Sequence, residues 1–292
     1  MFIRAFNEGP YKVDGSSVFG PVPWSEWRQV VTPDRSMRIT LQAFCLLVGT
    51  SMGWGLINTG IGFWHRSEDE MREKYSCPAS RLLKGLKNYG ISAREVRFVI
   101  LTDLRFPHAG GCIRLDRAGN LVPVFKNAQY FVQEAAIREA VSKKDPRVSS
   151  WYPDGETTIA VLTEKAKVHA LNGDAEIFPG LNVIRTDGPS RGHQVVIIND
   201  GGGRTIHPGS LFPTPHHTAL QCIPNFDIDP TQSLRQKTVW RQEIIEDHML
   251  VFFEGGDLGG VLGFHAGYLE VVRGESREEK VRIRQVNLVD AR

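Results

Sequence analysis

The alternation of apolar and polar positions in the first third of the chain predicts a hairpin, a helix and a buried strand. Residues 38–48 and 53–58 are apolar runs rich in strand formers on either side of a polar turn, which indicates an antiparallel pair. Residues 81–90 place apolar side chains at helical spacing and end in a glycine that stops helices. Residues 94–103 predict a buried strand that leads into an irregular loop at 104–111, a position where functional residues are common.

The rest of the chain continues to mix short strands with a few amphipathic helices. The pattern predicts helices at 134–141 and 233–247 and strands at 128–133, 157–162, 167–171, 181–185, 194–199, 203–207 and 249–254. This mixture is typical of an α+β fold in which two sheets pack together and helices cover their outer faces. No internal repeat, low-complexity tract or linker divides the chain, so we expect one domain over residues 1–292.

Composition excludes several classes of protein. The 292 residues are 41% hydrophobic and 23% charged, which is unlike a disordered chain, a fibre or a membrane bundle. The formal charge of +2 comes without basic clusters, so nucleic acid is not an expected partner. The N-terminus lacks the pattern of a secretory signal, and the most apolar segment, residues 43–57, is too short and interrupted to cross a membrane. We therefore expect a cytoplasmic protein without a membrane partner.

The four cysteines stand far apart in the sequence. Cys45, Cys77, Cys112 and Cys222 have neither C-x-x-C spacing nor a histidine at zinc-finger spacing. Buried free thiols are the expected outcome.

Four short motifs occur in a fixed order along the chain. They are Asn58-Thr59-Gly60, LTDLRFPHAGG at 101–111, GPSRGH at 188–193 and PGSL at 208–211. Their order and spacing resemble the metallo-β-lactamase superfamily. The segments VPWSEW at 22–27, FKNAQYFVQEAA at 125–136 and SLFPTPHH at 210–217 are most similar to its lactonase-like or methyl parathion hydrolase-like branch.

This resemblance implies a four-layer αβ/βα sandwich. It also implies that residues 1–36 form an N-terminal arm or lid that belongs to the pocket or to a dimer surface. A homodimer is left open by the same resemblance.

The resemblance also identifies the positions at which that family holds one or two zinc ions, which convert a bound water to hydroxide. The family's ligand positions fall on Asp103, Arg105, Pro107, His108, Pro189, Ser210 and either Gly255 or Gly256. Proline and glycine carry no donor atom, and a guanidinium is a cation without a lone pair. We therefore expect no zinc site of the family type, no metal and no cofactor.

The altered loop suggests acid–base chemistry without a metal. Arg105 can present a rigid fork of donors to a carboxylate or a developing oxyanion, and Asp103 can orient that fork. His108 can serve as acid or base, and Ser210 can hydrogen-bond a ligand or act as a nucleophile. The alternative is a dead cavity filled by an Asp103–Arg105 ion pair, with His108 and Ser210 as hydrogen-bonded packing.

Aromatic and histidine side chains are the candidates for substrate binding. The aromatic residues cluster around the segments that form the pocket rim in the family, and Trp24 and Phe106 carry the most weight among them. The full aromatic set is Phe19, Trp24, Trp27, Trp54, Phe63, Trp64 and Phe106. His193 matches the family's histidine that does not bind metal. The histidines without a counterpart in the family motifs include His207, His216, His217 and His265. Of these, His216, His217 and His265 join His193 as candidates for the pocket. The alternative for each is a purely structural role.

Three functional hypotheses follow. The first is a metal-independent enzyme that acts on a hydrophobic small molecule, such as a lactone, an amide or a polyketide-like ring, by acid–base chemistry with an arginine in place of the metal. The second is a non-catalytic pseudoenzyme that binds a small molecule or a partner. The third, ranked last, is a zinc hydrolase with an unusual ligand set.

Overall fold

The computed structural model describes most of the chain. The described residues are 1–62, 75–77, 80–142, 145–146, 149–152, 154–255, 261–265 and 268–272, with backbone alone for residue 150 and for the last two ranges. Phe63 and Trp64 lie outside these residues, and so does the side chain of His265.

The first sheet contains the N-terminal half of the strands. Its order is β1-β2-β3-β4-β7-β8, formed by Phe2–Asp14, Arg38–Thr50, Gly53–Ile57, Val96–Ile100, Gln129–Gln133 and Lys167–Leu171. β1 and β2 form a long antiparallel pair from Phe2 opposite Gly49 to Asp14 opposite Arg38. β3, β4, β7 and β8 run parallel to one another, so their carboxyl ends meet at one edge of the sheet.

The second sheet is formed mostly by antiparallel pairs. Its order is β15-β14-β13-β12-β11-β10-β9. The strands are β9 Ala175–Phe178, β10 Leu181–Arg185, β11 Gln194–Asn199, β12 Arg204–His207, β13 Leu250–Phe252, β14 Val261–His265 and β15 Tyr268–Val272. Only β12 and β13 pair in parallel, so these two strands also end at a common edge. A separate two-stranded sheet joins β5 Ile113–Leu115 to β6 Leu121–Pro123.

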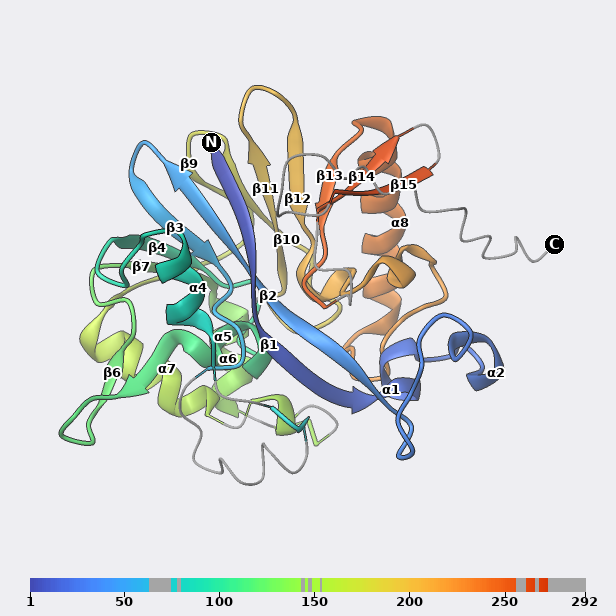
Figure 1. Cartoon of the computed structure of the whole chain (residues 1–292), viewed down its shortest axis with the longest axis horizontal. Helices are drawn as coiled ribbons and strands as arrows, with labels where there is room; N and C mark the ends of the chain where they lie inside the picture. The colour runs from blue at the N-terminus through green and yellow to red at the C-terminus, as the bar shows by residue number, and fades with distance from the viewer. Residues whose placement is uncertain are drawn as a thin grey trace.

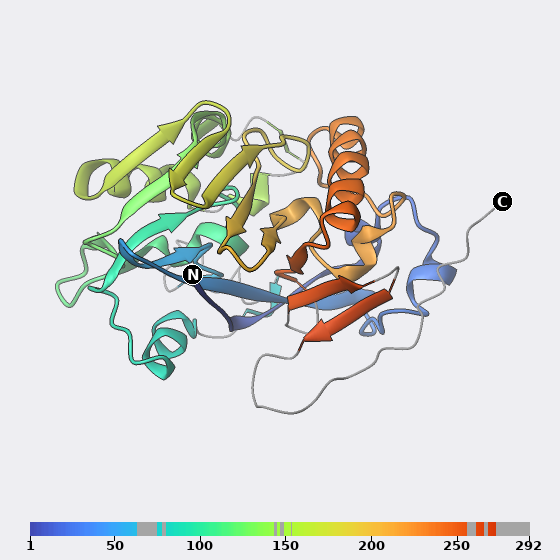
Figure 2. The same cartoon turned by 90° about the horizontal axis from the view of Figure 1, so that it is seen from above.

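Helices cover the outer faces of both sheets (Figures 1 and 2). α4, α6 and α7 lie with the first sheet and α8 lies against the second, while α1 and α2 project at the far end of the long β1–β2 pair. The bounds are α1 Gly15–Phe19, α2 Trp24–Trp27, α4 Leu82–Asn88, α5 Phe106–Ala109, α6 Glu134–Ser142, α7 Gly155–Lys165 and α8 Pro230–Glu246. Single 3-10 turns are η1 Gly110–Cys112, η2 Ser149–Trp151, η3 Gly209–Leu211 and η4 Pro215–Thr218.

The alternation of side chains along β11 shows how the layers are held together. Val195 and Ile197 pack with Trp240 of α8. Val196 and Ile198 point the other way, into a core shared with the first sheet. A third core lies between the first sheet and its helices. The order is therefore helix, sheet, sheet, helix, and the predicted α+β sandwich of four layers is confirmed.

Several short elements of the structure, among them β5, β6 and β9, were not predicted, and two differences concern longer segments. Residues 157–162 were predicted as a strand from their β-branched run, and this was wrong, because they lie within α7. The buried positions of that helix, Gly155, Thr158, Ile159 and Leu162, follow a helical period that the β-branched composition obscured. Residues 2–14 form β1, whereas no strand was predicted there. Among the described residues, no helix is long and apolar enough to span a membrane.

Candidate active site

The ends of three strands bring polar side chains together at one edge of the two sheets. Asn58 follows β3, Thr102 follows β4 and Glu254 follows β13. The Asn58 amide donates to Thr102 Oγ1 at 2.9 Å and to Glu254 Oε2 at 2.9 Å, and Asn58 Oδ1 accepts from the Thr102 backbone N–H at 2.9 Å. Asn58 therefore joins the two sheets at the point where the site begins, and its φ of 60° lies in the left-handed region that asparagine tolerates.

The loop after β4 folds around the carboxylate of Asp103. Its Oδ1 accepts the Arg105 backbone N–H at 3.0 Å, and its Oδ2 accepts Arg105 Nε at 2.7 Å. Pro107 follows at the start of the one-turn helix α5, where a missing N–H costs nothing. That turn places His108 on the other side of the same carboxylate, and its Nδ1 makes a hydrogen bond with Asp103 Oδ1.

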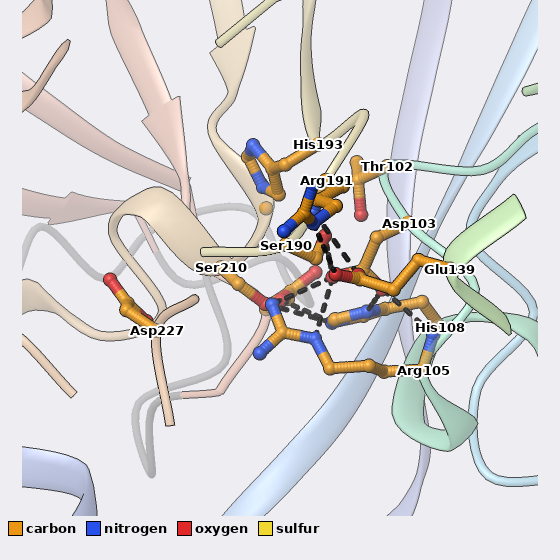
Figure 3. Close-up of polar contacts among 12 residues, drawn as sticks. Thr102, Asp103, Arg105, His108, Glu139, Ser190, Arg191, His193, Ser210 and Asp227 are labelled. Atoms are coloured by element: carbon orange, nitrogen blue, oxygen red, sulfur yellow. Dashed lines mark hydrogen bonds and ion pairs between the residues drawn. The ribbon is translucent and has the colours of Figure 1, made fainter. Parts of the chain in front are cut away.

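His108 is held between two carboxylates, and Figure 3 shows it beside the first of them, Asp103. Its Nδ1 faces Asp103, and its Nε2 lies 2.6 Å from Glu254 Oε1. The result is a continuous buried chain of charged groups, Arg105–Asp103–His108–Glu254, whose members are at most 6% exposed. We call these four residues the charge chain.

The charge chain fixes its own protonation states. Burial alone would lower the pKa of His108, but the carboxylates of Asp103 and Glu254 outweigh burial and raise it to about 9. Burial would raise the pKa of Asp103, yet Arg105 and His108 hold it well below its usual range, and His108 likewise lowers that of Glu254. At neutral pH the chain thus contains two carboxylates, a guanidinium and an imidazolium, and its formal charges cancel.

Arg105 keeps one unused donor inside the protein. Its Nη2 lies 2.7 Å from Asp103 Oδ2 but makes no hydrogen bond of acceptable angle there or elsewhere. The guanidinium carbon also lies 5.7 Å from the ring centroid of Phe226. A buried N–H without an acceptor is costly, so this atom is suited to receive a polar group from a ligand.

Two serine hydroxyls border the charge chain. Ser210 Oγ lies 3.4 Å from His108 Nε2 and 3.4 Å from Glu254 Oε1. Ser190 Oγ donates to Asp103 Oδ2 at 3.3 Å. The structure thus brings together all four residues that the sequence analysis proposed as catalytic, namely Asp103, Arg105, His108 and Ser210.

Two of the proposed substrate-binding residues lie beside this cluster. Phe106 packs in an aromatic group, with ring centroids 4.6 Å from Tyr75, 5.6 Å from Trp151 and 5.7 Å from Tyr11. His193 lies behind the loop, where its Nδ1 meets Thr186 Oγ1 at 2.6 Å and burial lowers its pKa to about 3. A neutral His193 therefore supports the loop, and a substrate contact by either residue stays a prediction.

The other proposed pocket residues lie elsewhere. Trp24 is 44% exposed in α2, far from α5 (Figure 1), with the Arg28 guanidinium 3.9 Å from its ring centroid. His217 bonds to Thr214 and to the Val18 carbonyl, and its ring stacks on Phe19. These contacts anchor η4 to α1.

His216 also lies beside the Phe19 ring, at 6.1 Å between centroids. The structure does not bring Trp24, His216 or His217 to the charge chain. The side chain of His265 lies outside the described residues.

Glu254 is the site residue that the sequence analysis missed. The resemblance placed the last family ligand at Gly255 or Gly256, whereas the side chain that reaches His108 comes from the residue before them. A signal was present, because Glu254 is the one acidic residue of the apolar run at 249–254 and stands where that strand ends. An acid at the end of a buried strand is seldom placed there by packing alone.

An open groove of about 1370 Å³ lies on the side of Ser190, and its lining does not include the residues of the charge chain. Its lining includes Ser190, which touches Asp103, and the buried pair of Glu139 and Tyr152, whose hydroxyl donates to Glu139 Oε2 at 2.7 Å. Glu139 and Arg191 lie beside the cluster in Figure 3. α6 and the loop at 185–191 form the walls.

No group of three or more histidine, cysteine, aspartate or glutamate side chains within the described part of the chain is arranged to hold a metal ion. Asp103, His108 and Glu254 are close together, but they hydrogen-bond to one another through the very atoms that would bind an ion. His108 has both ring nitrogens engaged in this way.

Comparison with solved structures identifies the class of fold. A probable metal-dependent hydrolase from Staphylococcus aureus superposes with a TM-score of 0.84 at 25% identity, covering 94% of this chain and 98% of that one. A hydrolase in the beta lactamase superfamily superposes with a TM-score of 0.71 at 17% identity, covering 94% and 95%. The chain therefore has the metallo-β-lactamase fold.

Within that fold, the sequence relatives are lactonases. An N-acyl homoserine lactonase of Bacillus cereus is 25% identical over 169 residues, which are 55% of this chain and 59% of that protein. A lactonase of the same name from Bacillus thuringiensis is 22% identical over 244 residues, 78% of this chain and 86% of the relative. No protein-family model matches the chain.

Proposed function

We propose that this chain is a metal-independent enzyme of the metallo-β-lactamase fold that acts on a hydrophobic small molecule with a reactive carbonyl, such as a lactone or amide. The observation that carries the proposal is the charge chain, in which Arg105 supplies a fixed cation at a family metal-ligand position. The names of the relatives support a lactone as the first substrate to test.

The protonation states assign the roles. His108, with its pKa raised to about 9, is an imidazolium at neutral pH and serves as an acid, one of the two roles that the sequence left open. Arg105 offers its unused N–H to the oxygen that gains charge during the reaction. Glu254, held as a carboxylate, is the proton acceptor.

A zinc ion does not fit these residues. A dication would stand next to a guanidinium and an imidazolium in a buried site, where like charges repel strongly. It would also have to break both hydrogen bonds of His108 to obtain a nitrogen ligand. No step of the proposed chemistry passes through a metal.

The decisive experiment combines metal analysis with turnover. Untagged protein purified with and without added zinc is analysed by inductively coupled plasma mass spectrometry, and acyl-lactone hydrolysis is assayed with and without EDTA. We expect metal well below one ion per chain and turnover that EDTA leaves unchanged. Arg105→Lys keeps the charge but not the fork, so it should retain part of the activity that Arg105→Ala loses.

The metal analysis also tests the third hypothesis, a zinc hydrolase with unusual ligands. Zinc at about one ion per chain, together with turnover that EDTA abolishes, would overturn the proposal. The metal-dependent hydrolase from Staphylococcus aureus makes this comparison necessary.

A binding protein without catalysis is the second candidate, and one observation favours it. The charge chain is buried and its charges are mutually satisfied, as in an ion network that merely fills a cavity. A small molecule that binds tightly in the groove and is recovered chemically unchanged would support this candidate. Turnover that depends on Arg105 would exclude it.

A further inference from the structure

We propose that Ser210 is a covalent nucleophile, which would make this site a serine hydrolase built on the metallo-β-lactamase fold. The inference rests on the proposed function and names the attacking atom. Ser210 Oγ is 3.4 Å from both His108 Nε2 and Glu254 Oε1. A hydroxyl next to a general base can be activated as a nucleophile, and here the base is the Glu254 carboxylate, with the His108 imidazolium beside it.

The backbone around Ser210 holds the hydroxyl in place. η3 begins directly after β12, and Gly209 adopts a φ of +52°. A Cβ at Gly209 would lie 2.8 Å from His193 Nε2 and 2.9 Å from Thr102 Cβ, so the turn is pressed against the base of the site. Contacts of 3.4 Å are long for hydrogen bonds, but such bonds in free enzymes often shorten when substrate binds.

Ser210 differs in its partners from the other serine of the site. Ser190 Oγ reaches only Asp103, whose two oxygens already accept from Arg105 and His108. Ser210 reaches Glu254, whose Oε1 also meets His108 and whose Oε2 accepts from Asn58, so this carboxylate is not bonded to Arg105. A proton released by Ser210 therefore has an acceptor that is not shared with the guanidinium.

The covalent step balances within the residues present. Ser210 Oγ forms a bond to the acyl carbon, its proton passes to Glu254 Oε1, and the carbonyl oxygen becomes an oxyanion. When the oxyanion collapses, the bond from the acyl carbon to the ring or alcohol oxygen breaks, and that oxygen takes the proton. Water then attacks the acyl-serine, gives one proton back to Ser210 Oγ and releases the carboxylic acid.

The test is covalent labelling of the full-length protein. The probes are p-nitrophenyl acetate, read as a burst of p-nitrophenol and an acetyl adduct, and a small alkyl fluorophosphonate, read by intact-protein and peptide mass spectrometry. We expect one adduct per chain, on the peptide that contains Ser210. Ser210→Ala should lose the adduct and reduce ester turnover on the order of 10³-fold.

Matched variants separate the chemistry from folding. Ser233→Ala removes a serine that is also buried but bonds to Asp227 outside the charge chain, and it should label like the wild type. Ser210→Cys replaces one nucleophile by another and should restore an acyl adduct. Peptide mapping of the wild type gives an answer even where Ser210→Ala does not fold.

The outcomes distinguish the two proposals. Metal-free turnover with no adduct, or with full activity in Ser210→Ala, would overturn the serine mechanism and leave the proposed enzyme standing with direct attack by water. An adduct that maps to another residue would also overturn it. Absence of both turnover and labelling would remove the proposed function together with this inference.

Discussion

The guanidinium of Arg105 and the carboxylate of Asp103 form the ion pair from which the site is built. Both side chains are buried, at 2% and 0% exposure, and they lie two residues apart on one loop. In such a setting the removal of one partner costs more than the pair contributes, because the remaining charge is left in a medium of low polarity.

This predicts a large and specific loss of stability on mutation of Arg105. Arg105→Ala should lower the free energy of unfolding by about 3–5 kcal/mol, measured by urea denaturation. Arg105→Ala combined with Asp103→Asn should recover part of that loss, because no bare carboxylate remains. A single variant within about 0.5 kcal/mol of the wild type would show that the ion pair is not formed.

The acid role of His108 predicts the direction of the pH profile. The pKa of His108 is raised to about 9 by Asp103 and Glu254, so the imidazolium is present below that pH and is lost above it. Turnover by an acid should therefore fall as pH rises through about 9, measured as kcat/KM between pH 6 and 10. A rate that instead rises through about 9 would show that His108 acts as a base.

At the scale of elements, α8 is attached to the loop before it through a buried lysine. Lys237 is 1% exposed, and its Nζ donates to the backbone carbonyls of Ala219 and Cys222 at 3.1 and 2.5 Å. Burial lowers the pKa of Lys237 to about 8, which is the cost of placing an ammonium there. The Ala219 carbonyl also accepts the Cys222 backbone N–H at 3.2 Å, so the ammonium adds a second donor there and is the donor described for the Cys222 carbonyl.

Replacement of Lys237 therefore tests how α8 is anchored. Lys237→Met keeps the length of the side chain but leaves the buried Cys222 carbonyl without its donor, at about 1–3 kcal/mol, while Ala219 O keeps the Cys222 N–H. We expect a clearly lower melting temperature by differential scanning calorimetry. Arg235→Met, an exposed position of the same helix, is the control and should change little. Equal melting temperatures for the two variants would contradict the anchoring role.

At the scale of the whole molecule, buried histidines set how stability depends on pH. Burial lowers the pKa of His193 and His217 to about 3 and that of His207 to about 4. The unfolded chain binds protons at these residues near pH 6.5, so the folded state loses stability as pH falls below that value. His108 has the opposite sign, and its contribution is lost as pH rises from about 6.5 to 9.

We therefore expect maximum stability near pH 6.5, with a steeper loss on the acid side. Asp227, whose pKa burial raises to about 6, opposes the acid loss, as do Glu8 and Glu139, whose pKa values burial also raises. Urea unfolding at intervals between pH 4 and 9.5 measures the curve. His217→Gln can keep a donor and an acceptor without titrating, and it should flatten the acid limb. An acid limb unchanged by this variant would mean that His217 does not contribute.

The sequence by itself determined much of the architecture. The apolar runs at 38–48, 94–103 and 194–199 each contain a strand of the structure, because the periodicity of buried side chains is a local property of the chain. Part of the helix at 155–165 was predicted as a strand, because its β-branched composition favours strands. Only the packing of this segment against the first sheet determines that it is helical.

The site likewise combines residues that the sequence could predict with one that it could not. Asp103, Arg105 and His108 lie within six residues of one another, so their association could be predicted from one loop. Glu254 could not, because it stands 146 residues from His108 and reaches it only when the two sheets pack face to face. The protonation of His108 depends on that contact as well as on Asp103. Local sequence thus determined the three groups of the loop, whereas the tertiary structure added Glu254 and decided which group is acid and which is base.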